Sequence, residues 1–297
     1  MAFEQDPQSG LWTPGPGYYD RMAESNVNST LHLIGRLGVA VPTFLQHGRP
    51  VVEVAPGFEA AQSEIAAGNL IIASTHRSGW ETIRQPARFE KVGLHHARPV
   101  NKVENMQNPI GRWVMHGLGS IAVDRNNADQ AGLLRANSGI LRRGGILNFY
   151  AGGTRKYKDI LEAEAVHSGI IFTAVHNSSL IVPTAVAGMS KEKRGKDEDR
   201  RTIARDKKAP FGIGPRVVYT FGAPFRLENP GFELEADMRK LTKPEFAQQR
   251  DYLRESAHVI QKRMQNMLSW AYALRGSSLE KRTPEFMEEL RARYNAE

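Results

Sequence analysis

Short apolar runs recur along the chain, each bounded by glycine, proline, asparagine or aspartate. The four runs are NLIIAST (69–75), ILNFY (146–150), LIVPTAV (180–186) and RVVYTF (216–221). Each is short and rich in β-branched or aromatic residues, which is typical of a strand buried inside a sheet. We therefore predict four buried strands.

Helical patterns lie between these runs and after them. In residues 127–143, Leu133, Leu134, Ile140 and Leu141 fall on one face, and Gly144-Gly145 ends the pattern. Further helical segments are predicted at 20–45 (weakly amphipathic, broken at Pro42), 57–67, 166–175, 244–275 and 284–294. Strands that alternate with helices predict an α/β fold, with a central, largely parallel sheet flanked by helices and with N-terminal and C-terminal helical extensions.

The predicted organisation is a single domain with an appended arm. Residues 1–19 are rich in proline and glycine, which is typical of an irregular segment. We expect residues 20–297 to form one α/β domain, with the C-terminal helices over about 244–295. No apolar stretch reaches the roughly 18 residues of a spanning helix, and the first residues lack a secretory pattern. We expect a cytoplasmic protein whose contact with a membrane is at most peripheral.

Composition narrows the chemistry. The 297 residues include no cysteine, which excludes disulfides, thiolate nucleophiles and cysteine-bound metal sites. The formal net charge is +8, and segment 190–208 alone contains nine Lys/Arg against five Asp/Glu. Such a run is ordinarily a solvated loop, but it leaves open a basic module that binds an anionic membrane or nucleic acid without catalysis. We expect no nucleic-acid partner, because aromatic residues do not interleave the run.

The strand over 69–75 leads directly into a candidate catalytic histidine, His76. Side chains at the carboxyl end of a strand lie where α/β folds place their sites. Ser78 and Glu81 fit the S-x-x-E capping box, so the chain turns and begins a helix here. That turn allows Glu81 to hold one nitrogen of His76, the usual arrangement of a general base. In the alternative, Glu81 only caps the helix and His76 is a structural histidine.

Two arginines follow other apolar segments. Arg125 ends the segment that starts at Gly119, and Arg155 comes after a strand, the Gly152-Gly153 turn and Thr154. Small residues let a ligand approach the backbone closely, and a guanidinium binds phosphate through two hydrogen bonds. The nucleotide-binding G-x-x-x-x-G-K-[ST] and the serine-hydrolase G-x-S-x-G motifs are absent. No metal-ligand spacing is present either, so we expect no metal.

Four blocks in this order resemble the glycerolipid acyltransferase family, which includes 1-acylglycerol-3-phosphate and glycerol-3-phosphate acyltransferases. The family's Asn-His-x4-Asp is similar to Thr75-His76-x4-Glu81, and its Phe-Pro-Glu-Gly-Thr-Arg is similar to residues 150–155, Tyr-Ala-Gly-Gly-Thr-Arg. Its glycine-to-arginine block resembles residues 119–125. Its proline block resembles Ile181-Val-Pro183. Lys102 also lies where the family commonly has such a residue. The resemblance covers about residues 60–225.

Two positions depart from the family pattern. The acidic partner of the histidine is Glu81 rather than aspartate, which alters the geometry of the pair but leaves it within reach. Gly152 stands where the family has a glutamate that helps to organise the acceptor site. Arg125 and Arg155 are present, so the resemblance still implies anion binding, while the identity of the acceptor is open.

The resemblance implies an acyltransferase. His76 and Glu81 would act as the catalytic pair, supported by Ser78 and Pro183. The anion site would use Arg125, Lys102, Gly152, Gly153, Thr154 and Arg155. The acyl group would pass from acyl-CoA or an acyl carrier protein to a hydroxyl of a small acceptor, with no cofactor besides the donor. The alternative within enzymes is acylation of a non-phosphorylated alcohol or amine, or of a carrier-bound intermediate, in specialised metabolism.

Overall fold

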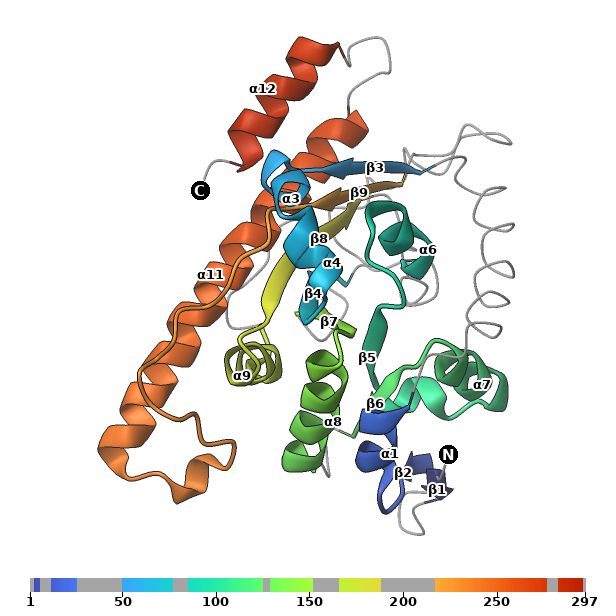
Figure 1. Cartoon of the computed structure of the whole chain (residues 1–297), viewed down its shortest axis with the longest axis vertical. Helices are drawn as coiled ribbons and strands as arrows, with labels where there is room; N and C mark the ends of the chain where they lie inside the picture. Colours follow the sequence, from blue (N-terminus) through green and yellow to red (C-terminus); the bar gives the residue numbers. More distant parts are fainter. Residues whose placement is uncertain are drawn as a thin grey trace, which may run out of the picture.

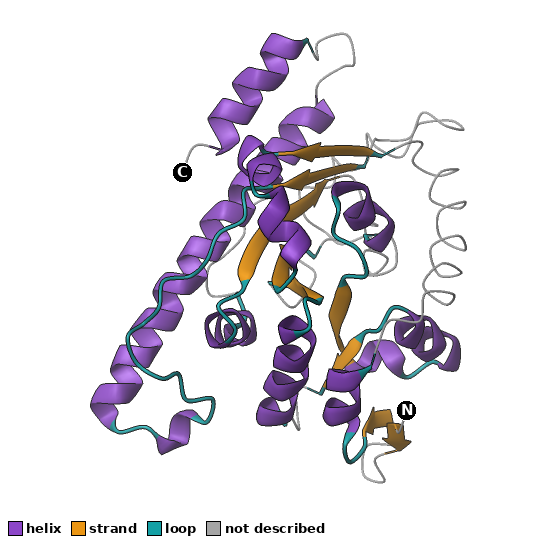
Figure 2. Cartoon of the chain, viewed as in Figure 1, coloured by secondary structure: helices purple, strands orange, loops and turns teal. Residues whose placement is uncertain are grey.

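A central sheet with helices on both faces forms the body of the protein (Figures 1 and 2). The computed structural model describes residues 3–5, 12–25, 50–76, 85–124, 129–151, 166–187, 217–276 and 283–295. Within these ranges the α/β architecture predicted from the sequence is confirmed.

Within the described ranges, the sheet has seven strands. In spatial order they are β3 (Val51–Val54), β9 (Val218–Phe221), β8 (Leu180–Ala187), β4 (Leu70–Ser74), β7 (Ile146–Tyr150), β5 (Arg98–Lys102) and β6 (Ile121–Val123). Strands β8, β4, β7, β5 and β6 are parallel to one another, whereas β9 runs antiparallel to β8 and pairs in parallel with β3. The four predicted strands are all present. Strands β3, β5 and β6 were not predicted from their sequences.

Helices cover the two faces of the sheet in separate layers. One face is covered by α3 (Pro56–Ala60), α4 (Gln62–Ala67) and α6 (Pro86–Phe89), whose Phe58, Ile65 and Phe89 are buried against β4, β7 and β8. The other face is covered by α1 (Tyr18–Glu24), α8 (Gln130–Arg142), α9 (Ser168–His176) and the long α11 (Lys243–Gly276). The remaining helices are η1 (Glu90–Val92), η2 (Val103–Met106), α7 (Pro109–Gly117), η5 (Met238–Lys240) and α12 (Pro284–Asn295).

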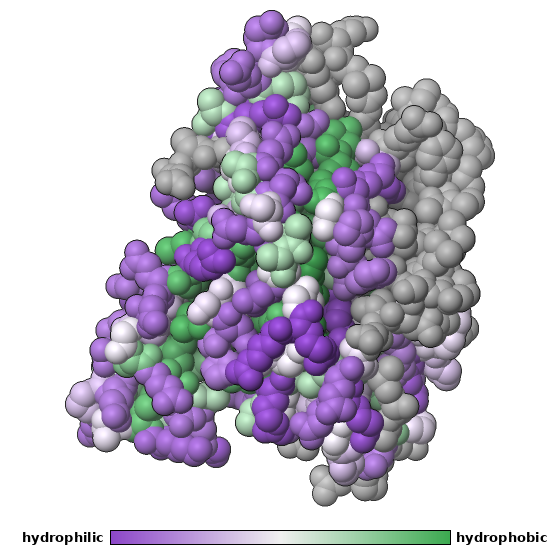
Figure 3. Space-filling view, viewed as in Figure 1, coloured by the Kyte–Doolittle hydropathy of each residue, from purple (hydrophilic) through white to green (hydrophobic). Residues whose placement is uncertain are grey.

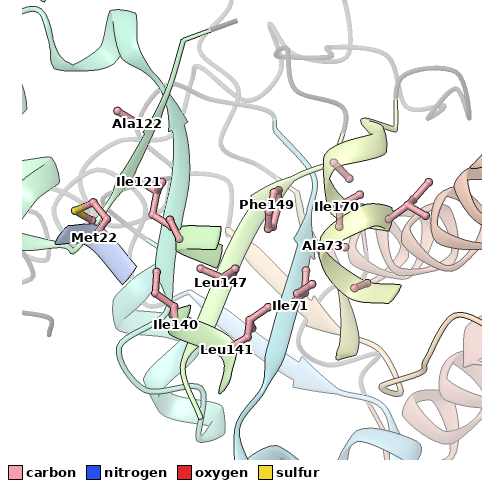
Figure 4. Packing of buried hydrophobic residues seen from close by; sticks show 14 of the residues in the cluster. Met22, Ile71, Ala73, Ile121, Ala122, Ile140, Leu141, Leu147, Phe149 and Ile170 are labelled. Atoms are coloured by element: carbon pink, nitrogen blue, oxygen red, sulfur yellow. The ribbon is translucent and has the colours of Figure 1, made fainter. Parts of the chain in front are cut away.

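The larger core lies on the face of α8 and α9. Ile71 and Ala73 of β4 and Leu147 of β7 point into it and meet Ile140 and Leu141 of α8 (Figure 4). Alternate residues of the same strands point to the opposite face, because side chains alternate along a strand. On the face shown in Figure 3, polar residues predominate among the coloured atoms, and apolar residues show mainly in the recesses between them.

The N-terminal segment departs from its prediction as an irregular arm. Strands β1 (Phe3–Gln5) and β2 (Trp12–Pro14) form an antiparallel pair, and α1 begins at Tyr18. The Tyr18 hydroxyl accepts a hydrogen bond from the amide of Ala122 at 3.0 Å, and the Tyr19 hydroxyl donates to the Ala122 carbonyl at 3.1 Å. Buried tyrosines thus satisfy polar groups of the edge strand β6, which fixes this segment to the domain.

The predicted helices are largely present, with local differences. The segment 57–67 forms two helices, α3 and α4, with a break at Ala61. In α8, Ile140 and Leu141 are buried while Leu133 and Leu134 are only partly covered. The C-terminal helices are confirmed as α11 and α12. Of the predicted helix 20–45, α1 covers the start, and residues 26–49 lie outside the described ranges. No described helix has the length and apolarity that crossing a bilayer requires.

Candidate active site

His76 lies just beyond the end of β4, near the middle of the sheet. The residue before it fixes the backbone. The Thr75 amide donates to the Thr184 carbonyl at 3.1 Å, and the Val186 amide donates to the Thr75 hydroxyl at 3.1 Å. Both bonds join β4 to β8 immediately before the histidine. His76 itself is half-buried.

The His76 ring lies against Tyr150, the last residue of the neighbouring strand β7. The two ring centroids are 4.5 Å apart and the ring planes meet at 35°. Tyr150 is 8% exposed and stands opposite Ser74 in the β4–β7 register. The contact brings the histidine of the first sequence block against the first residue of the third block.

A buried chain of hydrogen bonds runs beneath this ring pair. The Ser74 hydroxyl donates to Asn148 Oδ1 at 2.8 Å, and Asn148 Nδ2 donates to Gln85 Oε1 at 3.1 Å. The Tyr150 hydroxyl donates to the same Gln85 oxygen at 3.2 Å. All four residues are buried, and Gln85 is fully so. Gln85 and Asn148 are site residues that sequence analysis missed, because neither lies in a recognisable motif position.

The parallel strands end side by side and set the spacing of the blocks. Strands β4 and β7 are neighbours, so their ends lie about 5 Å apart. Strand β6 is the third strand from β4, which places its end roughly 14 Å from that of β4. Lys102 ends β5, between β7 and β6, and Asp124 follows β6 directly. The carboxyl edge therefore runs from His76 past the third block and Lys102 to the second block.

Pro183 sits inside the central strand β8, where a missing N–H group would normally cost a ladder hydrogen bond. The structure avoids this loss. The Ile181 amide, on the same side of the strand, bonds the Phe225 carbonyl, and the Pro183 carbonyl accepts from the Gly222 amide at 2.9 Å. Strand β9 ends at Phe221, so the pairing is interrupted beside the proline. Pro183 thus fits a local gap in the sheet.

All of the remaining predicted site residues lie outside the described ranges. They are Ser78, Glu81, Arg125, Gly152, Gly153, Thr154 and Arg155. The basic segment 190–208 also lies outside them. Their roles stay predictions, although the described strand ends that lead into them are fixed. Across the described part of the chain, no group of three or more His, Asp or Glu side chains could hold a metal ion.

Comparison with known proteins identifies the segment that contains this edge. Residues 57–187 match the family model described as Acyltransferase. This segment is therefore similar to the acyltransferase family. The match confirms the family resemblance seen in the sequence blocks, and the chain therefore is an enzyme with an acyltransferase domain.

The acyltransferase domain begins in α3 and ends with β8. It contains all five parallel strands, together with His76, Gln85 and Tyr150. Strands β3 and β9 and helices α11 and α12 lie outside the matched residues. The crystal structure of PlsC, the 1-acyl-sn-glycerophosphate (LPA) acyltransferase of Thermotoga maritima, resembles the chain with a TM-score of 0.46 and 16% identity, over 85% of this chain and 88% of that one. No curated protein matches the chain significantly in sequence.

Proposed function

We propose that the enzyme transfers an acyl group from a thioester, acyl-CoA or acyl carrier protein, to a hydroxyl of a small acceptor, with His76 as general base. The supporting observation is the place of His76. It follows a strand of the acyltransferase domain at the carboxyl edge of the sheet and is partly exposed. Its ring lies against Tyr150, the last residue of β7. Sites of α/β folds lie at this edge.

The proposed reaction needs no covalent intermediate on the protein. The neutral imidazole takes the acceptor's hydroxyl proton while the oxygen attacks the thioester carbonyl carbon. The resulting tetrahedral intermediate collapses, the C–S bond breaks, and the departing thiolate receives the proton from the imidazolium. An ester and a free thiol result. General-base assistance of this kind typically contributes about 10²–10⁴-fold in rate. A chain without cysteine is compatible with this direct transfer.

Glu81 is the proposed partner of His76. Two described residues flank it. His76 comes directly after Thr75, which is hydrogen-bonded to β8, and Gln85 accepts hydrogen bonds from Asn148 and Tyr150 of β7. Only eight residues separate these two fixed points. We propose that the Glu81 carboxylate fixes the imidazole tautomer and stabilises the imidazolium, with Ser78 capping the helix that starts here.

The proposed anion site uses the cations that follow β7, β5 and β6. Arg155 follows β7, next to β4, whereas Lys102 ends β5 and Arg125 comes directly after Asp124. With Thr154 and the Gly152-Gly153 backbone, these groups would hold a phosphate or another anion on the β7 side of His76. The basic segment 190–208 leaves β8, on the opposite side of β4, so we propose that it attracts the anionic donor.

Gly152 leaves the acceptor class open. A phosphate-bearing acceptor suits the arginines, and an acceptor without phosphate in specialised metabolism suits the missing glutamate. We further propose a cytoplasmic enzyme that touches membranes at most peripherally and needs no cofactor.

The proposal is tested with purified protein, acyl-CoA or acyl carrier protein of several chain lengths, and a panel of acceptors. Thiol release is followed together with mass spectrometry of the product. Thiol release that depends on the acceptor, with an ester as product, would support the proposal. No release with any pair, together with salt-sensitive binding to anionic vesicles, would favour the basic binding module instead.

A further inference from the structure

Tyr150 connects the candidate base to the buried glutamine. One face of its ring lies against His76, and its hydroxyl donates to Gln85 Oε1 at 3.2 Å. We propose that Gln85 is a positioning residue, which fixes the orientation of the His76 imidazole by holding Tyr150. This inference rests on the proposed role of His76 as the base.

Gln85 is itself held from three directions. Its carboxamide oxygen also accepts from Asn148 Nδ2, and Asn148 in turn accepts from Ser74. Its backbone carbonyl accepts from the amides of Arg88 and Phe89 at 2.7 and 2.9 Å, which starts α6. Gln85 is therefore locked to β7, through it to β4, and to α6. A group fixed in this way offers a rigid anchor for the phenol.

The anchor restricts the ring in a way that packing alone does not. An apolar ring in the place of Tyr150 could stack on the histidine, but it could also slide along it. The hydroxyl bond sets the position of the ring edge, and with it the surface on which His76 rests. The family's third block has phenylalanine where this chain has Tyr150, so the hydroxyl that bonds Gln85 is a feature of this chain.

The adjacent phenol ring also acts on the charge of the base. An aromatic face attracts a cation more than a neutral group. When His76 takes the acceptor's proton, the new imidazolium is stabilised by the adjacent Tyr150 ring. A ring that moves away loses this attraction and allows the imidazole to rotate from the acceptor hydroxyl. We therefore expect the loss of the anchor to lower kcat and to leave both KM values nearly unchanged.

Two conservative variants test the anchor. Tyr150→Phe removes one oxygen, and Gln85→Met keeps the length of the side chain while removing the acceptor. Each is expected to lower kcat about 10-fold to 100-fold, the range that small misplacement of a reacting group produces. Donor and acceptor KM should stay within about twofold. Because both changes break the same bond, the double variant should lose no more than the worse single one.

NMR of the His76 ring gives a readout that is independent of turnover. The His76 C–H signals, assigned with His76→Ala, feel the ring current of Tyr150, so both variants should shift them. Gln249→Met is the matched control. Gln249 is a buried glutamine of α11 that bonds the amide and carbonyl of Glu235 at 2.9 and 2.8 Å. Its loss should destabilise the fold without moving the His76 signals.

Wild-type kcat and unshifted His76 signals in a folded Gln85→Met or Tyr150→Phe protein would overturn the anchor. If Gln85→Met does not fold, Tyr150→Phe alone decides. Shifted signals in both variants together with full activity of His76→Ala would leave the anchor in place and refute the base. The failure of the Gln85–Tyr150 anchor and the failure of His76 as the general base are therefore distinguishable.

Discussion

The Val186 backbone amide donates a 3.1 Å hydrogen bond to the Thr75 hydroxyl, one residue before the candidate base. A second threonine, Thr184, lies nearby in β8 and is equally buried, but its hydroxyl has no hydrogen-bond partner within the described ranges. The two residues thus have the same side chain and burial but opposite hydrogen-bonding states.

Replacing each threonine with valine should separate these states. Thr75→Val leaves the Val186 amide unpaired in the core, which should cost about 1–3 kcal/mol of unfolding free energy. Thr184→Val removes a buried hydroxyl without a described partner and should be neutral or stabilising. Thermal and urea unfolding of the two variants provide the measurement. Equal destabilisation by both would show that the Thr75 bond has no special importance.

Alkaline stability should depend on the two tyrosines that bond β6. Burial raises the pKa of Tyr18 to about 12 and also raises the pKa of Tyr19 above its ordinary value. An unfolded tyrosine loses its proton near pH 10. The folded state therefore holds more protons above pH 10, and the stability that these groups contribute below pH 10 is lost as the pH rises from 10 toward 12.

The measurement is the melting temperature of wild type and of Tyr18→Phe/Tyr19→Phe between pH 8 and 12. The double variant should melt lower at pH 8, because it lacks the bonds to β6, but its melting temperature should fall less steeply above pH 10. If the melting temperatures of the two proteins fell in parallel above pH 10, Tyr18 and Tyr19 would not be the source of the alkaline loss of stability.

How far the sequence predicts the fold depends on the composition of each element. The strand at 146–150 was predicted with its observed bounds because every residue but Asn148 is apolar. Strands near the β6 edge of the sheet were harder to predict from the sequence. Strand β5 has the sequence RPVNK, and its Arg98 is buried only because its guanidinium donates to carbonyls of Gly119 and Ser25, each at 3.0 Å. These contacts form between distant segments, so no local pattern indicates them.

The candidate site likewise contains residues that the local sequence indicates and residues that only contacts between distant segments reveal. His76 is indicated by its place after an apolar run and by the block order. Gln85 has no such signal in the sequence. Its place in the site depends on hydrogen bonds with Asn148 and Tyr150, which are more than sixty residues away along the chain. Asn148 appears in the sequence as a polar exception inside a strand, and this exception could have pointed to a buried polar partner.

Glu81→Gln should cost more activity than stability. Glutamine preserves a capping box, but a neutral amide cannot stabilise the imidazolium of His76. Turnover and melting temperature are measured on the same preparation. A lower melting temperature with unchanged turnover would assign Glu81 to the helix cap alone.

Gly152 predicts an altered choice of acceptor. Without the glutamate of the family pattern, we expect poor turnover with glycerol 3-phosphate and with lysophosphatidic acid, and better turnover with another acceptor. Comparing kcat/KM across an acceptor panel checks this. Efficient, saturable acylation of either standard acceptor would show that Gly152 does not restrict the site.

The most direct test of the account is the turnover of folded His76→Ala with the best donor and acceptor. His76 lies beyond the end of β4 and is partly exposed, so its truncation should leave the melting temperature and the circular dichroism nearly unchanged. Without the base, kcat should fall about 10²–10⁴-fold. A folded His76→Ala protein that turns over near the wild-type rate would contradict general-base catalysis by His76.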